Sequence, residues 1–211
     1  MRIEVFSSPE AALEAALAWL LAQLARSPSG VLAGGETPLP VYRTLARLAH
    51  GYKGTLFLSD ERWLPPSDPG TNLHRVAEAL GPLASRLLPF PLGMPPEEAR
   101  SWMEQRLAPQ LPLGFALLGI GEDGHTASLF PGSPALSSPH LVEVVLGPKP
   151  PALRLTLTPR AFWGTREVLF LALGAGKRQA LLRLAQGEAL PPLQVAHGAE
   201  EAWLFTDQEV A

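Results

Sequence analysis

The chain has 211 residues, a formal net charge of −3 and 46% hydrophobic against 18% charged residues, the composition of a globular rather than a disordered protein. Its lysines and arginines are scattered without a basic run, so the charge pattern gives no indication of a nucleic-acid partner. The lack of cysteine excludes disulfides, thiol catalysis and cysteine-ligated metals.

The first predicted element is a helix that begins at Ser8-Pro9, where a capping hydroxyl precedes a proline at the first helical position. Leucines then recur at helical spacing as far as Leu24 and form one apolar face. This apolar segment is interrupted by Glu14, is too short to cross a bilayer and follows no basic region. We therefore expect no membrane partner and a soluble, cytoplasmic protein.

The chain then repeats one scheme four times, in which a short apolar strand leads through a polar loop into a helix. The four loops are 34–37, 59–62, 119–125 and 174–177. The strands are continuous apolar runs, as expected where helices cover both faces of a sheet. The repetition predicts an α/β fold in one domain, 1–211, with a doubly wound, mainly parallel sheet between helices, a Rossmann-like three-layer sandwich.

Two later stretches depart from that scheme. Residues 140–147 and 152–159 are rich in β-forming residues and are separated by a Gly-Pro-Lys-Pro-Pro turn, which predicts a hairpin or edge pair. Residues 200–207 predict a final strand. In parallel sheets, ligands bind beyond the carboxyl ends of the strands, so we expect the four polar loops to form one site.

Loop 34–37 offers the free amides of Gly34 and Gly35 and the hydroxyl of Thr37 at the beginning of a helix, a common way to bind phosphate. The alternative is a plain strand-to-helix turn. Loop 174–177 adds a cation, Lys177, and Arg166 at the start of the preceding strand could bind phosphate in a bidentate way. The usual magnesium ligands of a nucleotide hydrolase are missing from these loops.

Loop 59–62 contains three consecutive charged residues, Asp60, Glu61 and Arg62, at the end of a strand. They form either a solvated charged loop or part of the predicted site. Their position between bulky Leu58 and Trp63 favours the site.

Residues 119–124 match the spacing G-x-G-x-x-G of dinucleotide-binding loops. That fingerprint requires a long following helix, but Pro131 limits the helix here to about two turns. We therefore expect no nucleotide cofactor. Gly121 and Gly124 instead let the backbone turn tightly, so that its amides and His125 face a small anion or a carbonyl.

His125 follows Asp123 and Gly124 at the predicted start of a helix, where amides favour a bound negative charge. Its titration range suits general acid–base catalysis, and Asp123 could orient the ring. The other histidines lack such neighbours, and no histidine pair has the spacing of metal ligands, so we predict no metal site; they are His50, His74, His140 and His197.

Together these loops resemble the 6-phosphogluconolactonases of the oxidative pentose phosphate pathway. GGETP is similar to their S-G-G-S-T-P signature, SDERWLPPSDPGTN to their D-E-R-x-V-P…S-N block, and LGIGEDGHTASLFPG to their L-G-x-G-x-D-G-H-T-x-S-L-F-P-G block. RLTLTP, GAGK and AWLFTD follow in the same order, so the resemblance covers nearly the whole chain. The departures include Glu36 for the usual serine, Trp63 where a small residue is common, and Thr71 before Asn72.

The glucosamine-6-phosphate deaminases share that fold and an Asp-Gly-His loop, but their block reads D-G-H-I-A-F-N-E-P. Phe130 stands here in place of their catalytic acid, and D-E-R replaces their D-E-Y. Both positions favour the lactonase. A deaminase or isomerase and a non-catalytic sugar-phosphate sensor remain the alternatives.

The resemblance implies the fold of those deaminases and of ribose-5-phosphate isomerase, and hydrolysis of 6-phospho-D-glucono-1,5-lactone without a metal or cofactor. We expect a phosphosugar lactone as partner of a monomer or small homo-oligomer. Gly35, Thr37, Arg166 and Lys177 would hold the 6-phosphate, and His125 would act as general base. Arg62 or the amides of 121–124 would stabilise the oxyanion, and Asp60 would orient Arg62 or His125, although base and oxyanion stabiliser are not distinguished by spacing. The 23 prolines and single asparagine are thermophile tendencies.

Overall fold

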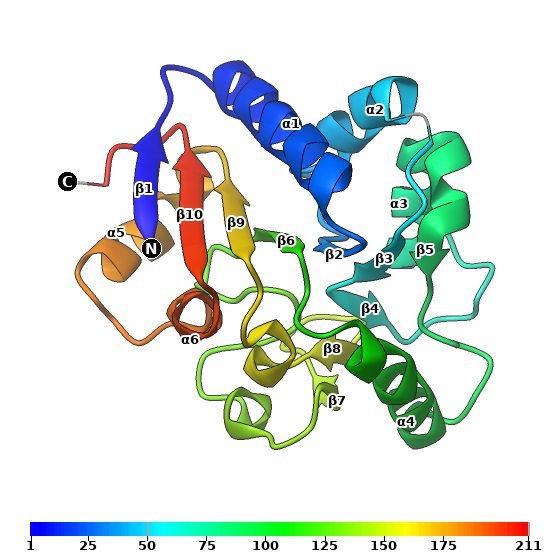
Figure 1. Cartoon of the computed structure of the whole chain (residues 1–211). Coiled ribbons are helices and arrows are strands. Elements are labelled where there is room, and N and C mark those ends of the chain that lie inside the picture. The colour runs from blue at the N-terminus through cyan, green and yellow to red at the C-terminus, as the bar shows by residue number, and fades with distance from the viewer. Residues whose placement is uncertain (50, 211) are drawn as a thin grey trace.

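The computed structural model describes residues 1–49 and 51–210 and has a seven-stranded parallel sheet at its centre (Figure 1). The order across the sheet is β1-β10-β9-β6-β2-β3-β5. From β2 the chain steps outward to β3 and β5 on one side, and then to β6 and β9 on the other, which confirms the doubly wound prediction. The strands are β1 (Arg2–Val5), β2 (Ser29–Leu32), β3 (Thr55–Leu58), β5 (Leu87–Leu88), β6 (Phe115–Gly119), β9 (Glu167–Ala172) and β10 (Glu201–Thr206).

Helices surround this sheet, and Figure 1 shows α1, α2 and α3 following one another along one side of it. The first helix begins as predicted, because the Ser8 hydroxyl accepts a hydrogen bond from the Ala11 amide at 3.2 Å. β2, β6 and most of β9 are buried along their length, as expected for strands covered on both faces. The helices are α1 (Pro9–Arg26), α2 (Leu39–Leu48), α3 (Asn72–Leu80), α4 (Pro96–Leu107), α5 (Arg178–Ala185) and α6 (Pro191–Gly198).

A second, antiparallel sheet lies beside the first and has the order β4-β8-β7. The predicted hairpin is confirmed as β7 (Val142–Leu146) and β8 (Leu153–Leu157). β4 (Asp60–Arg62) was expected to be a polar loop, but it forms a strand because it pairs with the remaining edge of β8, with Arg62 opposite Arg154. Side chains alternate along this short strand, so its first and third residues share one face and Glu61 lies on the other.

The short helix predicted after His125 is not formed. Residues 121–130 make a series of turns, closed by an isolated bridge between Thr126 and Leu129. Ala127 lies between these two residues with a φ of 52°, in the left-handed region that interrupts a right-handed helix. His125 therefore does not lie at the start of a helix, as expected from the sequence. The amides available to an anion beside it belong to a turn.

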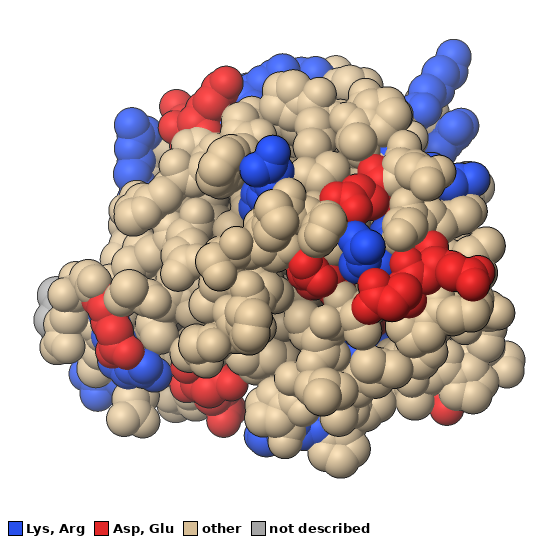
Figure 2. All heavy atoms as spheres, turned by 90° about the horizontal axis from the view of Figure 1, so that it is seen from below, with Lys and Arg blue, Asp and Glu red and all other residues tan. Residues whose placement is uncertain are grey.

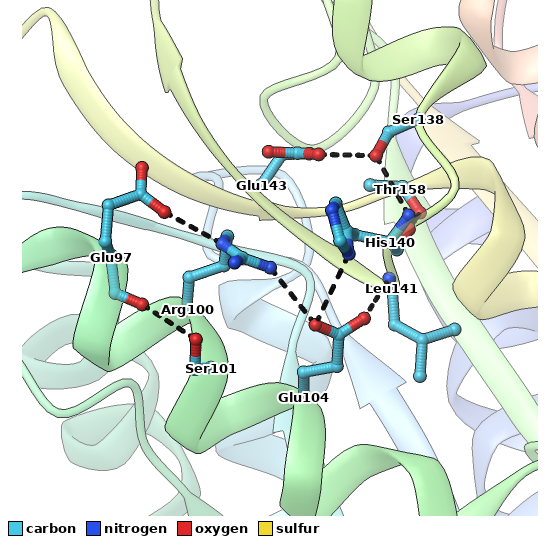
Figure 3. Close-up of polar contacts among 9 residues, drawn as sticks. All are labelled: Glu97, Arg100, Ser101, Glu104, Ser138, His140, Leu141, Glu143 and Thr158. Atoms are coloured by element: carbon cyan, nitrogen blue, oxygen red, sulfur yellow. Dashed lines mark hydrogen bonds and ion pairs between the residues drawn. The ribbon is translucent and has the colours of Figure 1, made fainter.

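The helix α4, which sequence reasoning did not predict, is joined to the start of β7 by a network of polar side chains (Figure 3). The Glu104 carboxylate accepts hydrogen bonds from the Leu141 amide at 2.7 Å and from Arg100 Nη1 at 3.1 Å, and His140 Nδ1 lies 3.8 Å away. Ser138 donates to Glu143 in the same network. We refer to Arg100, Glu104, Ser138, His140 and Glu143 as the α4 cluster.

Seen from below, the molecule presents acidic and basic side chains interspersed on a largely uncharged surface (Figure 2). The acidic groups on this face gather mainly on the side where α4 lies in Figure 1. In the part of the chain that the structure describes, no helix combines the length and apolar character needed to cross a membrane.

Candidate active site

The loops that follow β2, β3, β6 and β9 meet in one cleft of about 280 Å³. Because β2 and β6 are neighbours in the sheet and the chain leaves them in opposite directions, the cleft lies at the topological switch point. Its lining includes many of the predicted site residues together with Arg154 of β8; they are Gly34, Gly35, Thr37, Asp60, Arg62, Gly121, His125 and Lys177. The four loops expected to form one site thus line one cleft.

A larger hollow of about 1040 Å³ lies next to this cleft, and Asp123 and Phe130 line it. Prolines and aliphatic side chains of residues 131–148 form much of its wall, and the polar groups described there include no histidine or lysine. The smaller cleft brings together a histidine, a lysine, two arginines and two carboxylates. Chemistry rather than size therefore identifies the smaller cleft as the candidate active site.

His125 is held in one orientation by its own turn. Asp123 Oδ1 lies 2.5 Å from His125 Nδ1 and also accepts a hydrogen bond from the His125 amide at 3.1 Å. The imidazole lies against the Phe130 ring, with the ring centroids 4.8 Å apart. Because Asp123 accepts the proton on Nδ1, Nε2 is the nitrogen left to accept a proton from a substrate or water.

The turn around His125 depends on two glycines. A Cβ at Gly121 would lie 2.1 Å from His125 Nδ1, so any side chain there would displace the imidazole. Gly124 has a φ of 88° and lies against Leu190 rather than in the cleft. The glycines of the G-x-G-x-x-G match therefore make room for His125 and permit the turn.

Asp123 carries a charge that supports this arrangement. Burial by itself would raise the pKa of the Asp123 carboxyl, but the two hydrogen bonds from His125 and the charge of its ring outweigh burial and lower the pKa. The carboxylate therefore stays ionised near neutral pH, where it both orients the ring and stabilises a proton held on it.

Asp60 connects the His125 loop to β3 and β4. Its Oδ1 accepts a hydrogen bond from the Ser59 hydroxyl at 2.8 Å, and its Oδ2 accepts one from the Ser128 hydroxyl at 2.6 Å. Asp60 was expected to orient Arg62 or His125, and its carboxylate accepts its hydrogen bonds from two serines. Ser128 lies three residues after His125 in the same loop, so this bond connects Asp60 to the loop that carries the histidine.

Glu61 points away from the cleft and is fully buried. Its carboxylate accepts hydrogen bonds from the backbone amides of Arg62, Asn72 and Leu73 at 2.7, 2.6 and 2.8 Å. Burial raises the pKa of Glu61 to about 7, although the three amides counteract part of that rise. Glu61 therefore fixes the beginning of α3 and the backbone of Arg62. Its role is structural, although its two neighbours in the charged triplet 60–62 line the cleft.

Three cationic side chains line the cleft. Arg62 donates from Nη1 to the Gly70 carbonyl at 3.0 Å, and burial, followed by the charge of Arg75, lowers the pKa of its guanidinium. Arg154 was missed at the sequence level, although the alternation of β8 and its pairing opposite Arg62 place it on the cleft side. Lys177 comes from the loop after β9, as predicted.

Arg166 does not belong to this site. It is exposed and precedes β9, and its backbone bonds to Leu113 and Glu201 at the amino ends of the strands. The cleft lies at the carboxyl ends, about 20 Å away along a six-residue strand. The expectation that Arg166 binds the phosphate is therefore corrected, because a residue that opens a strand cannot share a site with the loop that follows it.

No group of three histidines, carboxylates or cysteines in the described ranges, 1–49 and 51–210, could hold a metal ion. His140 belongs to the α4 cluster rather than to the cleft. His50 lies outside the described residues.

Comparisons with known proteins place the whole chain in one family. The sequence pattern of the family described as Glucosamine-6-phosphate isomerases/6-phosphogluconolactonase matches residues 8–204. A 6-phosphogluconolactonase of Caulobacter vibrioides is 33% identical over 215 aligned residues, which cover 93% of this chain and 91% of that relative.

Solved structures give the same result for the fold. A 6-phosphogluconolactonase from Thermotoga maritima superposes with a TM-score of 0.87 at 27% identity, covering 97% of this chain and 98% of that one. A monomeric glucosamine-6-phosphate deaminase superposes with a TM-score of 0.86 at 22% identity, covering 100% and 98%, and shares the fold.

Proposed function

The chain belongs to the glucosamine-6-phosphate isomerase/6-phosphogluconolactonase family, and we propose how its cleft hydrolyses 6-phospho-D-glucono-1,5-lactone to 6-phospho-D-gluconate. This activity is that of a carboxylic ester hydrolase in the pentose phosphate pathway. The observation that carries the mechanism is the pairing of His125 with Asp123 at the edge of a cleft that also contains Lys177 and two arginines. Phe130, which packs on His125, occupies the position of the acid in the deaminase motif.

The phosphate of the substrate is bound by loop 34–37 and Lys177. Gly35 leaves open space around its backbone, and Thr37 supplies a hydroxyl at the same end of the cleft. Amides, a hydroxyl and an ammonium group are the donors that phosphate requires. Holding the phosphate fixes the lactone ring relative to His125 and contributes to the rate by orientation.

His125 acts as the general base. Nε2 accepts a proton from a water molecule as the water oxygen forms a bond to the lactone carbonyl carbon. The resulting tetrahedral intermediate carries its negative charge on the former carbonyl oxygen. When the bond from that carbon to the ring oxygen breaks, the proton passes from Nε2 to the ring oxygen, which leaves as a hydroxyl.

The charge on the intermediate is stabilised by Arg62, with the amides of residues 121–124 as further donors. Arg154 lies opposite Arg62 in the sheet and adds positive charge to the same wall of the cleft. Its guanidinium is held by the carbonyls of Pro151 and Lys149 at 3.1 and 3.2 Å, so it is already positioned before substrate binds.

The remaining features of the protein extend this proposal. Residues 1–211 form one catalytic domain that works in the cytoplasm as a monomer or small homo-oligomer. The lack of cysteine fits a reducing compartment, and the many prolines fit a thermophilic source.

The test is a hydrolysis assay at constant pH with 6-phosphogluconolactone generated in place and the spontaneous rate subtracted. We expect saturable acceleration by the wild type and a fall in kcat of about 10²- to 10⁴-fold for His125→Ala, with a small change in KM. His140→Ala is the matched control, because this histidine lies outside the cleft, and it should retain wild-type kcat. Wild-type activity that survives in His125→Ala would contradict the mechanism. No acceleration by the wild type would direct the search to ammonia release from glucosamine 6-phosphate.

A further inference from the structure

Glu36 is an acidic residue in a loop that is otherwise suited to bind an anion. It lies between Gly35 and Thr37 and contributes to the lining of the cleft. A carboxylate a few ångströms from a phosphate dianion weakens binding by Coulomb repulsion. Unless its charge is compensated, Glu36 therefore opposes the function of its own loop.

Arg75 of α3 compensates that charge. Arg75 Nη1 forms an ion pair with Glu36, which connects the loop after β2 to a helix 39 residues away in sequence. The Glu36 side chain is 78% exposed, whereas the Arg75 side chain is 20% exposed. Glu36 is thus the more exposed partner, and the largely buried guanidinium determines where its carboxylate points.

Arg75 is itself held in place from behind. Its Nη2 donates to Asn72 Oδ1 at 3.1 Å, and Asn72 Nδ2 donates to the Asp60 carbonyl at 2.9 Å. Asn72 also packs beneath Gly34, where a Cβ would lie 2.2 Å from its Cγ. The arginine is therefore fixed relative to loop 34–37 through a buried asparagine that touches the loop.

The nitrogens of Arg75 leave little for a ligand. Nη1 faces Glu36, Nη2 faces Asn72, and Nε is buried without a partner. Glu36 and Asn72 line the cleft, and Arg75 lies outside its lining. The geometry therefore favours an indirect role for Arg75, exerted through Glu36, over a direct contact with the phosphate.

We propose that Arg75 is a specificity-determining positioning residue, which draws the Glu36 carboxylate away from loop 34–37 and so allows the loop to accept a phosphorylated substrate. The inference rests on the proposed function in one respect, because it takes loop 34–37 as the place of the substrate phosphate. It adds a second requirement for phosphate binding, a neutralised Glu36, to the donors of the loop. This requirement does not apply to substrates without a phosphate, so their binding does not depend on Arg75.

The experiment is a double-mutant cycle on the full chain with Arg75→Met, Glu36→Ser and the combined variant. Steady-state kinetics with 6-phosphogluconolactone and with unphosphorylated glucono-1,5-lactone give kcat and KM. Titration calorimetry with inorganic phosphate gives an affinity that does not depend on turnover. Arg75→Lys keeps the charge, and thermal unfolding of each variant checks that it is folded.

We expect Arg75→Met to raise KM for the phosphorylated lactone about five- to tenfold, to weaken phosphate binding by a similar factor, and to leave kcat within about twofold. In the Glu36→Ser background the same change should have almost no effect, and Arg75→Lys should restore most of the affinity. An equal loss in both backgrounds would mean that Arg75 binds phosphate directly and would overturn the proposal. Unchanged phosphate affinity in Arg75→Met would overturn it as well. If phosphate affinity changes across the double-mutant cycle as expected, but the wild type has no lactonase activity, the inference stands and the proposed function is refuted.

Discussion

Two clusters of polar side chains, each organised by carboxylates, are expected to respond differently to the loss of a hydrogen bond. One cluster is buried and the other is exposed to solvent. The first, which we call the cleft cluster because it supports the β4 wall of the cleft from behind, comprises Ser59, Asp60, Glu61, Asn72 and Ser128, all of which are at most 7% exposed. In the α4 cluster, Glu104 is 26% and His140 49% exposed. When a buried hydrogen bond is lost, the remaining donor or acceptor is left without any partner, whereas at the surface water takes the place of the lost partner. The cleft cluster therefore determines the site, and the α4 cluster joins two elements that would largely remain in place without it.

The largest expected effect concerns the pH dependence of stability. The pKa of Glu61 is raised from 4.5 to about 7, chiefly by burial, so the folded state holds this proton more tightly than the unfolded state does. The stabilisation is present below about pH 4.5 and is lost as the pH rises through 7, by up to about 3 kcal/mol. Denaturant unfolding of the wild type between pH 5 and pH 8 should show this decline relative to Glu61→Gln, which cannot ionise. Parallel curves for the two proteins would contradict it.

The next effect is on catalysis. Asp60→Ala removes the acceptor of two serine hydroxyls and the negative charge beside Arg62, and should lower kcat about 100-fold through displacement of the His125 loop. Asp60→Asn separates the two causes, because a serine hydroxyl accepts a hydrogen bond from an amide nitrogen while the charge is lost. A smaller loss of kcat in Asp60→Asn than in Asp60→Ala would show that the effect comes from displacement of the His125 loop rather than from the lost charge.

The matched control for this comparison is Glu104→Ala in the α4 cluster. It removes hydrogen bonds from Leu141 and Arg100, and should cost about 1 kcal/mol of stability with kcat unchanged. A change in kcat as large as that of Asp60→Ala would show that the two clusters do not differ as described.

The last comparison is between two serines, one buried and one partly exposed, and the exposed one gives the smallest expected effect. Ser128→Ala leaves Asp60 Oδ2 without its hydroxyl donor in a buried place and should lower the free energy of unfolding by about 2 kcal/mol. Ser138→Ala removes a hydroxyl that donates to Glu143 in a partly exposed place and should cost less than about 0.5 kcal/mol. Chemical denaturation of both variants measures the difference, and equal losses would remove burial as its cause.

The sequence predicted those parts of the molecule that follow from local patterns. Buried parallel strands read as continuous apolar runs, and Ser8-Pro9 marks a helix start, so the main sheet and the position of the site could be inferred. His125 and Lys177 line the same cleft, as expected, because each follows a strand of the parallel sheet at its carboxyl end.

The errors have a shared physical origin in tertiary contacts. β4 is a strand only because β8 lies beside it, and Arg154 enters the cleft through that same pairing. Arg166 was misplaced because the residues at the two ends of one strand are adjacent in the sequence motif but far apart in space. The structural role of Glu61 could not be predicted, because two of its three amide donors belong to α3, eleven and twelve residues away.

The edge of the central sheet has a consequence for how the protein is made. Among the described residues, β1 pairs with one strand, β10, whose residues 201–206 are separated from it by most of the chain. A contact between residues so far apart in sequence cannot form while the chain is still short. It also slows folding, because a long loop must close first. During synthesis, β1 therefore stays without its partner strand until residues 201–206 have been made, and its register is set by β10.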